Sequence, residues 1–480
     1  MKKVLFIAVI GILLFSTVAF AQSGFVSPDQ VMPNAPHMVN NQLFRNVPFI
    51  GASQMNSYIA NSSNGFIGMG DNNYIAYVHS VFSVRGYKLR AFKMVNGRIT
   101  QKGPILLTED LDNKYEPVMV SLSATNAVFC ISNYSTSLRS YCVTLNPSTL
   151  TLTMSAAHND TTASYICGIF LNLMRYSDTQ AILTTFDAGA NKTTMRYINT
   201  SAGSITSVSG HVSDSFSYTS SALHSGMVTD NHFTSFTVNN GSNYIQTVYA
   251  NGSGFTRSAF STTAISPGTN MTGIFFRGKG RATAIAGVAF AYSNNTLDVG
   301  STNPVHYVVS NSTSSALYNT DAGDIYQKIS IAIDDTYAVL LGVRSNSNMN
   351  VPILFLLGFD NEQTVTTAQQ INANISICDI KYLVNMPIDP YVTGGTSQAN
   401  RSYTPFVSIY LQSSSNYSLS PANKNYWYYD SNEKILYFGA PWGWQGNQEG
   451  SKANASTFMI VPIKIEIDEA GARFGTLNLK

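Results

Sequence analysis

The chain has 480 residues, with 28 Lys and Arg against 26 Asp and Glu, and charged residues make up only 11 % of it. Without Lys2 and Lys3 the formal charge is zero, so the protein lacks the positive field that attracts phosphate backbones, and we expect no nucleic-acid partner. A near-neutral surface also favours association, which is compatible with a structural coat or an ordered assembly.

The first 21 residues have the pattern of a secretory signal peptide. A basic start, Met1–Lys3, precedes an apolar run over 4–18 and the small-residue pattern of Ala19 and Ala21. We expect cleavage before Gln22; a transmembrane anchor is the alternative, but the run is short for one. No later apolar stretch is long enough to span a membrane, so we expect a mature chain without a transmembrane segment, secreted or at the cell surface, with the periplasm as the other export compartment.

Residues 22–64 are predicted to form an extended N-terminal arm rather than a domain. Four prolines, Pro28, Pro33, Pro36 and Pro48, argue against regular structure here. The arm, or the tail over 474–480, could supply a strand that closes a ring of sheets, or the arm could pack on the surface. An arm that pairs with a neighbouring molecule would instead produce a polymer.

A strand followed by a turn recurs from residue 65 to residue 480 with a period of roughly 52 residues. The eight copies of this strand begin at Phe92, Val143, Arg196, Val248, Tyr307, Phe355, Val407 and Met459. Repetition of strands at this period predicts an all-β fold, a single β-propeller of about eight four-stranded blades. The fifth copy is irregular, lying 59 residues after Val248 and 48 before Phe355, so seven blades is the alternative.

The second repeat illustrates the four strands of one blade. Short apolar or alternating runs over 117–123, 127–131, 138–145 and 149–154 are separated by polar turns. The first turn recurs in other copies, for example at Asp71, Asp178, Asp230, Asp334, Asp389 and Asp430. Asp and Asn suit this turn because their side chains bond the nearby backbone.

This repeat loosely resembles the secreted β-propeller repeats of bacteria and their phages. Val95-Asn96-Gly97-Arg98-Ile99-Thr100 and Gly203-Ser204-Ile205-Thr206 are the closest matches to the hairpin of those repeats, within a likeness that covers about 66–475. The resemblance implies the fold and no particular activity, because the calcium loop of integrin-type propellers and the Asp box of sialidases are missing.

The bonding state and location of the four cysteines are predicted from their place in the repeats. Cys130 and Cys142 lie in neighbouring strands about equally far from a hairpin tip, so they are either a disulfide or two buried thiols. Cys167 and Cys378 each precede the Asp turn by eleven residues. We expect both on innermost strands, as free buried thiols on opposite sides of the channel.

No metal site, cofactor site or histidine motif is recognisable in the sequence, and no serine-hydrolase elbow is present. The remaining enzymatic hypothesis is a pair of carboxylates at the channel mouth, as glycosidases require. The acids placed on inner strands by the period are Glu116, Asp324, Asp379 and Asp430, with Arg277, Lys328 and Lys381 as nearby bases.

Aromatic side chains are concentrated in the last repeat, which contains all three tryptophans. The candidate residues for binding a ligand or partner are Trp427, Tyr429, Trp442, Trp444 and Asn447. Exposed aromatic faces beside amides can stack on sugar rings or form protein interfaces, whereas buried rings would only fill the core of the blade.

These patterns favour an exported, non-enzymatic β-propeller that serves as a cell-surface, matrix or filament component through protein contacts, self-assembly included, or glycan contacts. A carbohydrate-active enzyme is the alternative, and a virion-associated receptor-binding propeller is disfavoured by the signal peptide. Asn-x-Ser/Thr sequons, such as those at Asn61, Asn133 and Asn191, are compatible with a glycoprotein.

Overall fold

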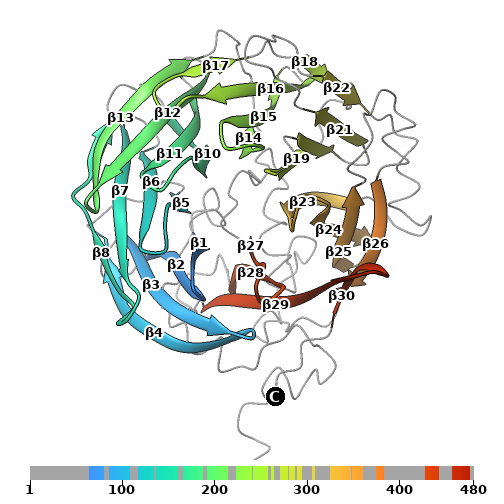
Figure 1. Ribbon diagram of the computed structural model, residues 1–480, viewed down its shortest axis with the longest axis horizontal. Helices are drawn as coiled ribbons and strands as arrows, with labels where there is room; N and C mark the ends of the chain where they lie inside the picture. The colour runs from blue at the N-terminus through green and yellow to red at the C-terminus, as the bar shows by residue number, and fades with distance from the viewer. Residues whose placement is uncertain are drawn as a thin grey trace, which may run out of the picture.

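Seven antiparallel sheets stand around a central axis in the computed structural model, each with one strand nearest the axis (Figure 1). The structure describes residues 64–80, 86–108, 117–133, 137–160, 166–187, 192–213, 223–239, 242–257, 261–263, 271–278, 281–286, 289–294, 305–308, 325–346, 349–359, 375–382, 427–442 and 457–475. Every regular element in these ranges is a strand, so the predicted all-β propeller is confirmed. No helix within these ranges has the length and apolar character to cross a membrane.

The first four sheets, named blades 1 to 4, follow one another along the chain. Blade 1 contains β1 (Asn64–Gly70), β2 (Asn73–Ser80), β3 (Gly86–Val95) and β4 (Arg98–Leu107). Blade 2 contains β5 (Pro117–Ser121), β6 (Asn126–Asn133), β7 (Ser137–Asn146), β8 (Thr151–Met154) and β9 (His158–Asp160). Blade 3 contains β10 (Ile166–Arg175), β11 (Gln180–Asp187), β12 (Lys192–Ser201) and β13 (Ser204–Ser213). Blade 4 contains β14 (Leu223–Met227), β15 (His232–Asn239), β16 (Ser242–Ala250), β17 (Phe255–Arg257) and β18 (Ser261–Thr263).

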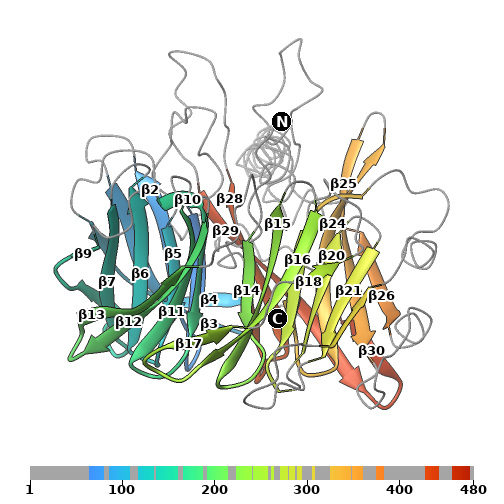
Figure 2. The ribbon, with the colours of Figure 1, turned by 90° about the horizontal axis from the view of Figure 1, so that it is seen from above.

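Three further sheets, named blades 5 to 7, are described in the rest of the chain. Blade 5 contains β19 (Met271–Phe276), β20 (Arg281–Ala286), β21 (Ala289–Asn294) and β22 (Val305–Val308). Blade 6 contains β23 (Ile325–Ala332), β24 (Tyr337–Asn346), β25 (Met349–Phe359) and β26 (Ile375–Tyr382). Blade 7 contains β27 (Trp427–Asp430), β28 (Ile435–Trp442), β29 (Thr457–Asp468) and β30 (Gly471–Phe474). Figure 2 shows the blades side by side, with their strands steeply inclined across the thickness of the disc.

Each sheet is hydrogen-bonded in chain order, so every described blade is built from strands that follow one another in the sequence. Neighbouring blades contact one another around the ring, and β1 of blade 1 also contacts β27 and β28 of blade 7. The arm before residue 64 and the tail after residue 475 lie outside the described residues, so a closing strand from either stays a prediction. In the described residues, blades 7 and 1 are in direct contact.

The described part of the chain holds seven sheets where eight repeats were expected. Tyr307 lies in β22, the fourth strand of blade 5, whereas the other copies in the described ranges lie in third strands. Tyr307 is therefore out of register with the other copies. Val407, which marks the seventh copy, lies outside the described residues.

The turn after each inner strand is closed by one polar side chain in several blades. Asp334 Oδ1 accepts the backbone N–H groups of Thr336 and Tyr337 at 2.7 Å each. Asp430 Oδ1 does the same for Asn432 and Glu433, at 2.9 and 3.0 Å. These bonds explain why Asp recurs at this position of the repeat.

The hydrophobic core is divided among the spaces between neighbouring blades. One cluster joins β1–β3 of blade 1 to β6–β8 of blade 2, and its largest members include Tyr77, Phe129 and Tyr141. Comparable clusters join blade 2 to blade 3 and blade 3 to blade 4. Each blade thus depends on its neighbours to bury its faces.

The contact between the first and last blades, called the closing seam, is rich in aromatic rings. Tyr74 of β2 stacks on Phe92 of the same blade, with ring centroids 5.7 Å apart. It also meets Tyr428 and Tyr437 of blade 7 edge-on at 5.4 Å. The Tyr74 hydroxyl donates to Asp430 Oδ2 at 3.3 Å, so both packing and hydrogen bonding hold the seam.

Polar bonds from the β3–β4 hairpin reinforce the closing seam. Asn96 and Gly97 form its tip with positive φ angles of 49° and 78°, as an Asn-Gly hairpin turn requires. The Asn96 N–H donates to Glu433 Oε1 at 2.9 Å, and the Gly97 N–H donates to the Tyr437 hydroxyl at 3.2 Å. Glu433 also accepts the Tyr437 hydroxyl at 2.7 Å.

Candidate functional site

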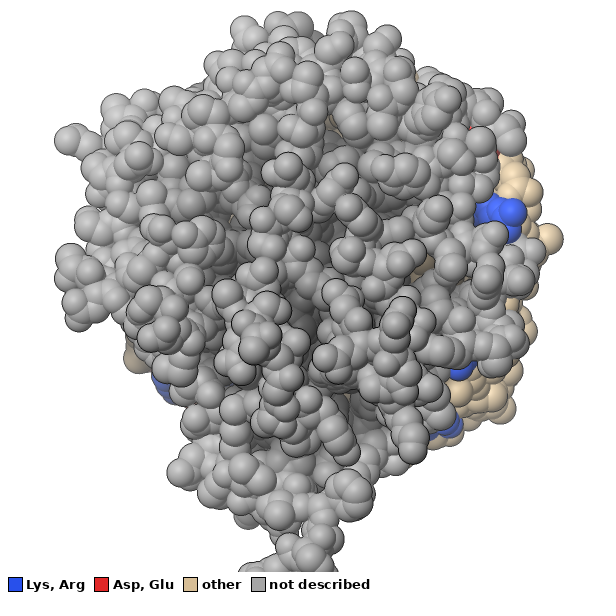
Figure 3. Space-filling view, turned by 180° about the vertical axis from the view of Figure 1, so that it is seen from behind, with Lys and Arg blue, Asp and Glu red and all other residues tan. Residues whose placement is uncertain are grey.

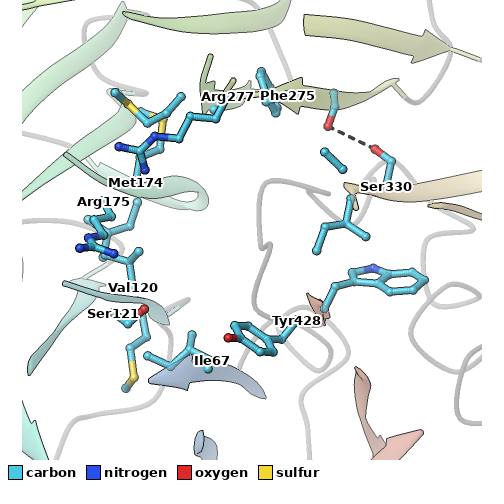
Figure 4. A pocket seen from close by; sticks show the side chains of 18 residues that line it. Ile67, Val120, Ser121, Met174, Arg175, Phe275, Arg277, Ser330 and Tyr428 are labelled. Carbon is cyan, nitrogen blue, oxygen red and sulfur yellow. Dashed lines mark hydrogen bonds between the residues drawn. The ribbon is translucent and has the colours of Figure 1, made fainter. Parts of the chain in front are cut away.

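A pocket of about 360 Å³ lies at the centre of the ring and is lined by the innermost strand of every blade, β1, β5, β10, β14, β19, β23 and β27. Its wall is mostly apolar and includes three methionines, Met119, Met174 and Met227. Figure 4 shows the side chains of this channel pocket, which converge from separate blades on a common space. Pockets of this size, mostly apolar and with a few polar groups, are typical binding sites for small ligands.

Close approaches between inner strands shape the channel pocket. A Cβ added at Gly226 of β14 would lie 2.2 Å from the Phe275 ring of β19, and one at Gly68 of β1 would lie 2.1 Å from the Tyr428 ring of β27. Glycine at these two positions lets an aromatic ring of the neighbouring blade lie flat on the strand. Phe275 and Tyr428 are thereby held at the pocket wall.

Side chains also bond the backbone of the neighbouring blade where inner strands run side by side. The Ser330 hydroxyl of β23 donates to the Gly273 carbonyl of β19 at 3.2 Å, the bond drawn in Figure 4. Asn172 of β10 donates through Nδ2 to the Ser225 carbonyl of β14 at 2.6 Å. These bonds link the inner strands of neighbouring blades and help to fix the spacing of the wall.

The charged groups of the channel pocket are two arginines. Of its 18 lining residues, Arg175 at the end of β10 and Arg277 just after β19 carry charge, and none is Asp, Glu, His, Lys or Cys. Arg175 pairs with Asp178 at 2.5 Å, and Arg277 pairs with Asp230 of the neighbouring blade at 3.0 Å. Arg175 lies three residues before Asp178 of its turn, and Arg277 directly precedes the turn at Gly278, a register signal that could have identified them beforehand.

The structure places the predicted carboxylates apart. Asp379 and Lys381 lie on β26, the outermost strand of blade 6, so their assignment to an inner strand is wrong. Asp430 does end an inner strand, but its oxygens accept the turn N–H groups and the Tyr74 hydroxyl. Glu116 and Asp324 lie outside the described residues, as does the side chain of Lys328.

The predicted aromatic binding residues divide between the pocket and undescribed parts of the chain. Trp427 lines the channel pocket but is 5 % exposed, so most of its ring is buried in blade 7. Tyr429 is half-buried, and burial together with the charges of Asp334 and Asp430 raises its pKa to about 12. Trp442 is the last residue of β28, and the structure does not describe its side chain. Trp444 and Asn447 lie outside the described residues. Their predicted role in binding remains a prediction.

Cys130 and Cys142 are both buried free thiols, so the alternative of a disulfide is not what the structure contains. The β6–β7 register explains this: Cys130 faces Ser140, and Cys142 faces Val128, so the two sulfurs are offset by two residues. Cys378 is free and half-buried on the outer strand β26, so its predicted place across the channel from Cys167 is wrong. Cys167 does lie on the innermost strand β10, with its side chain outside the described residues.

Alkylation tests this assignment of the thiols. Burial raises the pKa of Cys130 to about 12, against smaller opposite effects of Ser140 and Arg196, so the reactive thiolate is scarce at pH 8. Cys130 should resist iodoacetamide in the native protein. In denaturant without reductant, both Cys130 and Cys142 should become labelled in a peptide mass map. Peptides that stay unlabelled until a reductant is added would show a disulfide instead.

The described surface carries no continuous basic area in the view opposite to Figure 1. Lys and Arg atoms appear there as separate spots near the rim (Figure 3). Among the described residues no group of three or more His, Cys, Asp or Glu side chains is arranged to hold a metal ion.

Comparison with known proteins gives matches among solved structures. No protein-family model matches it, and no curated protein matches it. A putative 6-phosphogluconolactonase from Bacteroides fragilis is similar with a TM-score of 0.43 and 11 % identity, over 82 % of this chain and 96 % of that one. The periplasmic gluconolactonase of Pseudomonas aeruginosa is similar with a TM-score of 0.41 and 10 % identity, over 83 % of this chain and 99 % of that one. The Nup133 β-propeller domain of Vanderwaltozyma polyspora is similar with a TM-score of 0.35 and 11 % identity, over 59 % of this chain and 81 % of that one.

Proposed function

We propose that this protein is an exported, non-enzymatic β-propeller that acts as a cell-surface, matrix or filament component and binds protein or glycan partners. The observation that carries the proposal is the composition of the channel pocket. Among the described lining residues, its wall joins apolar and aromatic side chains to two arginines, with no carboxylate or imidazole that could serve as a general acid or base. Such a wall is suited to recognition rather than to bond cleavage.

The rival hypothesis, a carbohydrate-active enzyme, needs two carboxylates about 5 to 10 Å apart at the channel. Among the described residues, Asp430 is the one predicted inner-strand acid that ends beside the pocket, and it is bonded within its turn and to Tyr74. Export is part of the proposal because of the signal-peptide pattern over residues 1–21.

A paired binding and hydrolysis assay tests this function. Mature protein, residues 22–480, is applied to glycan and peptide arrays, and the same glycans are assayed for released reducing ends. We expect binding without release, and a loss of binding in Ser121→Phe, which places a ring in the channel pocket. Release of reducing ends by the wild-type protein would contradict the proposal.

A further inference from the structure

We propose that the channel pocket binds a carboxylate carried on an apolar body, with Arg175 and Arg277 holding the carboxylate. The inference deepens the proposed binding function and rests on it. The same chemistry is found in a free aliphatic acid and in the C-terminal end of an apolar peptide. The size of the pocket, about 360 Å³, suits a group of either kind.

The two arginines are placed on one side of the channel pocket. Figure 4 shows Arg175 and Arg277 close to Met174 on the same side of the space, with Ser330 across from them. They come from β10 and from the end of β19, strands separated by blade 4. Both guanidinium groups lie at the same edge of the pocket, where they provide planar arrays of N–H donors that match a carboxylate.

The ion pairs of these arginines leave them able to take a second acceptor. Each ion pair is formed through Nη2, whereas a guanidinium has five N–H donors. The partner acids face solvent, with Asp178 75 % and Asp230 88 % exposed, while the arginines are about half-exposed at 45 % and 46 %. Exposed pairs of this kind are weak and easily rearranged, so they orient the guanidinium groups without saturating them.

The remaining wall would accommodate the apolar body. Val120, Phe275, Ile331 and Tyr428 line the channel pocket and are partly exposed to it. The three methionines around them offer polarizable, adaptable contact to a flexible aliphatic chain. Charge at one side and an apolar wall elsewhere match an amphipathic anion better than an uncharged sugar.

Calorimetric titration with matched probes tests the inference on the mature chain. The probes are octanoate, octanol and octylammonium, with N-acetyl-Leu-Leu and its C-terminal amide as the peptide arm. We expect octanoate or N-acetyl-Leu-Leu to bind at least tenfold more tightly than its uncharged counterpart, as hydrogen bonds to charged groups imply. Stronger binding of one arm over the other identifies the free acid or the peptide end as the source.

Substitutions of the two arginines and of their partner acids should change the affinity for the anionic probe in opposite directions. Arg175→Gln and Arg277→Gln should each weaken binding of the anionic probe about tenfold or more. Asp178→Asn and Asp230→Asn should tighten it by up to about fivefold, because a competing negative charge is removed. Arg473→Gln is the matched control and should leave binding unchanged. Arg473 lies on the outer strand β30, is 47 % exposed and pairs with Glu466 and Asp468 of β29.

The opposite result would overturn the inference. If the Asp substitutions weaken binding and the Arg substitutions strengthen it, the pocket prefers cations. If no carboxylate probe binds at millimolar concentration while the protein still binds its array partners, the inference fails and the proposed function stands. If both binding and array recognition are absent, the proposed function fails as well.

Discussion

Replacing Arg196 with Met should lower the free energy of unfolding by about 3 to 5 kcal/mol, because the substitution leaves a buried carboxylate without its cation. Arg196 of β12 is fully buried and pairs with Asp160 of β9, which is 8 % exposed. It also donates to Thr194 Oγ1 at 3.2 Å. The pair joins blade 3 to blade 2, so its loss should loosen the contact between these blades. Chemical denaturation of the mature protein measures the change.

A double substitution separates the ion pair from simple packing. Arg196→Met with Asp160→Leu removes both charges, and replacing a buried pair by apolar groups is often neutral or stabilising. We therefore expect the double variant to recover most of the stability that the single variant loses. A single variant with the stability of the wild type would show that this pair does not hold blades 2 and 3 together.

Replacing Tyr437 with Ala should cost about 3 to 5 kcal/mol and open the closing seam, since a fully buried ring is removed between blades 7 and 1. Hydrogen exchange should accelerate in β1–β3 and in β27–β29 together, because Tyr437 belongs to the core cluster that joins these strands. The matched control is Phe129→Ala at the contact of blades 1 and 2. It should cost a similar amount but leave exchange in β27–β29 slow.

The seam should also weaken in alkali. Burial and the bond to Glu433 raise the pKa of Tyr437, and burial raises that of Tyr74, so both phenols stay protonated when folded. Unfolding then releases protons above about pH 10, where free tyrosine ionises, and stability falls as the pH rises past that value. Tyr437→Phe should make this decline shallower. An unchanged decline in that variant would exclude Tyr437 as its source.

Strand and turn positions within a repeat were predictable from local sequence patterns. In blade 2 the expected strands over 117–123, 127–131, 138–145 and 149–154 correspond closely to β5–β8. Alternation of side chains and the Asp turn are local signals, so they survive without knowledge of the tertiary structure. The period then places these strands in blades.

The order of a strand within its blade was less predictable. The segment with Cys378 precedes an Asp turn like an inner strand, yet it pairs with β25 as the outermost strand of blade 6. Tyr307 was misplaced in the same way, from third to fourth strand. The two edge strands of an antiparallel blade have similar local patterns, and only the pairing across the sheet distinguishes them.

Only part of the candidate site was predictable, because the pocket is assembled from strands that lie far apart in the sequence. The sequence drew attention to aromatic rings in the last repeat, but the channel pocket takes one or more residues from every blade. Arg175 and Phe275 have ordinary surroundings in the sequence and become notable only when the ring brings inner strands together. Arg277 was noted as a base beside expected acids, whereas its actual partner is Asp230.

Hydrogen exchange of the mature protein with and without saturating octanoate tests the central claim, that the channel pocket is where this protein binds. The account predicts slower exchange in β10, β14 and β19 and in the turns over 176–179 and 228–231. The outer strands β4, β8 and β13 should be unchanged. Protection confined to those outer strands, or bound octanoate with no protection at the inner strands, would contradict it.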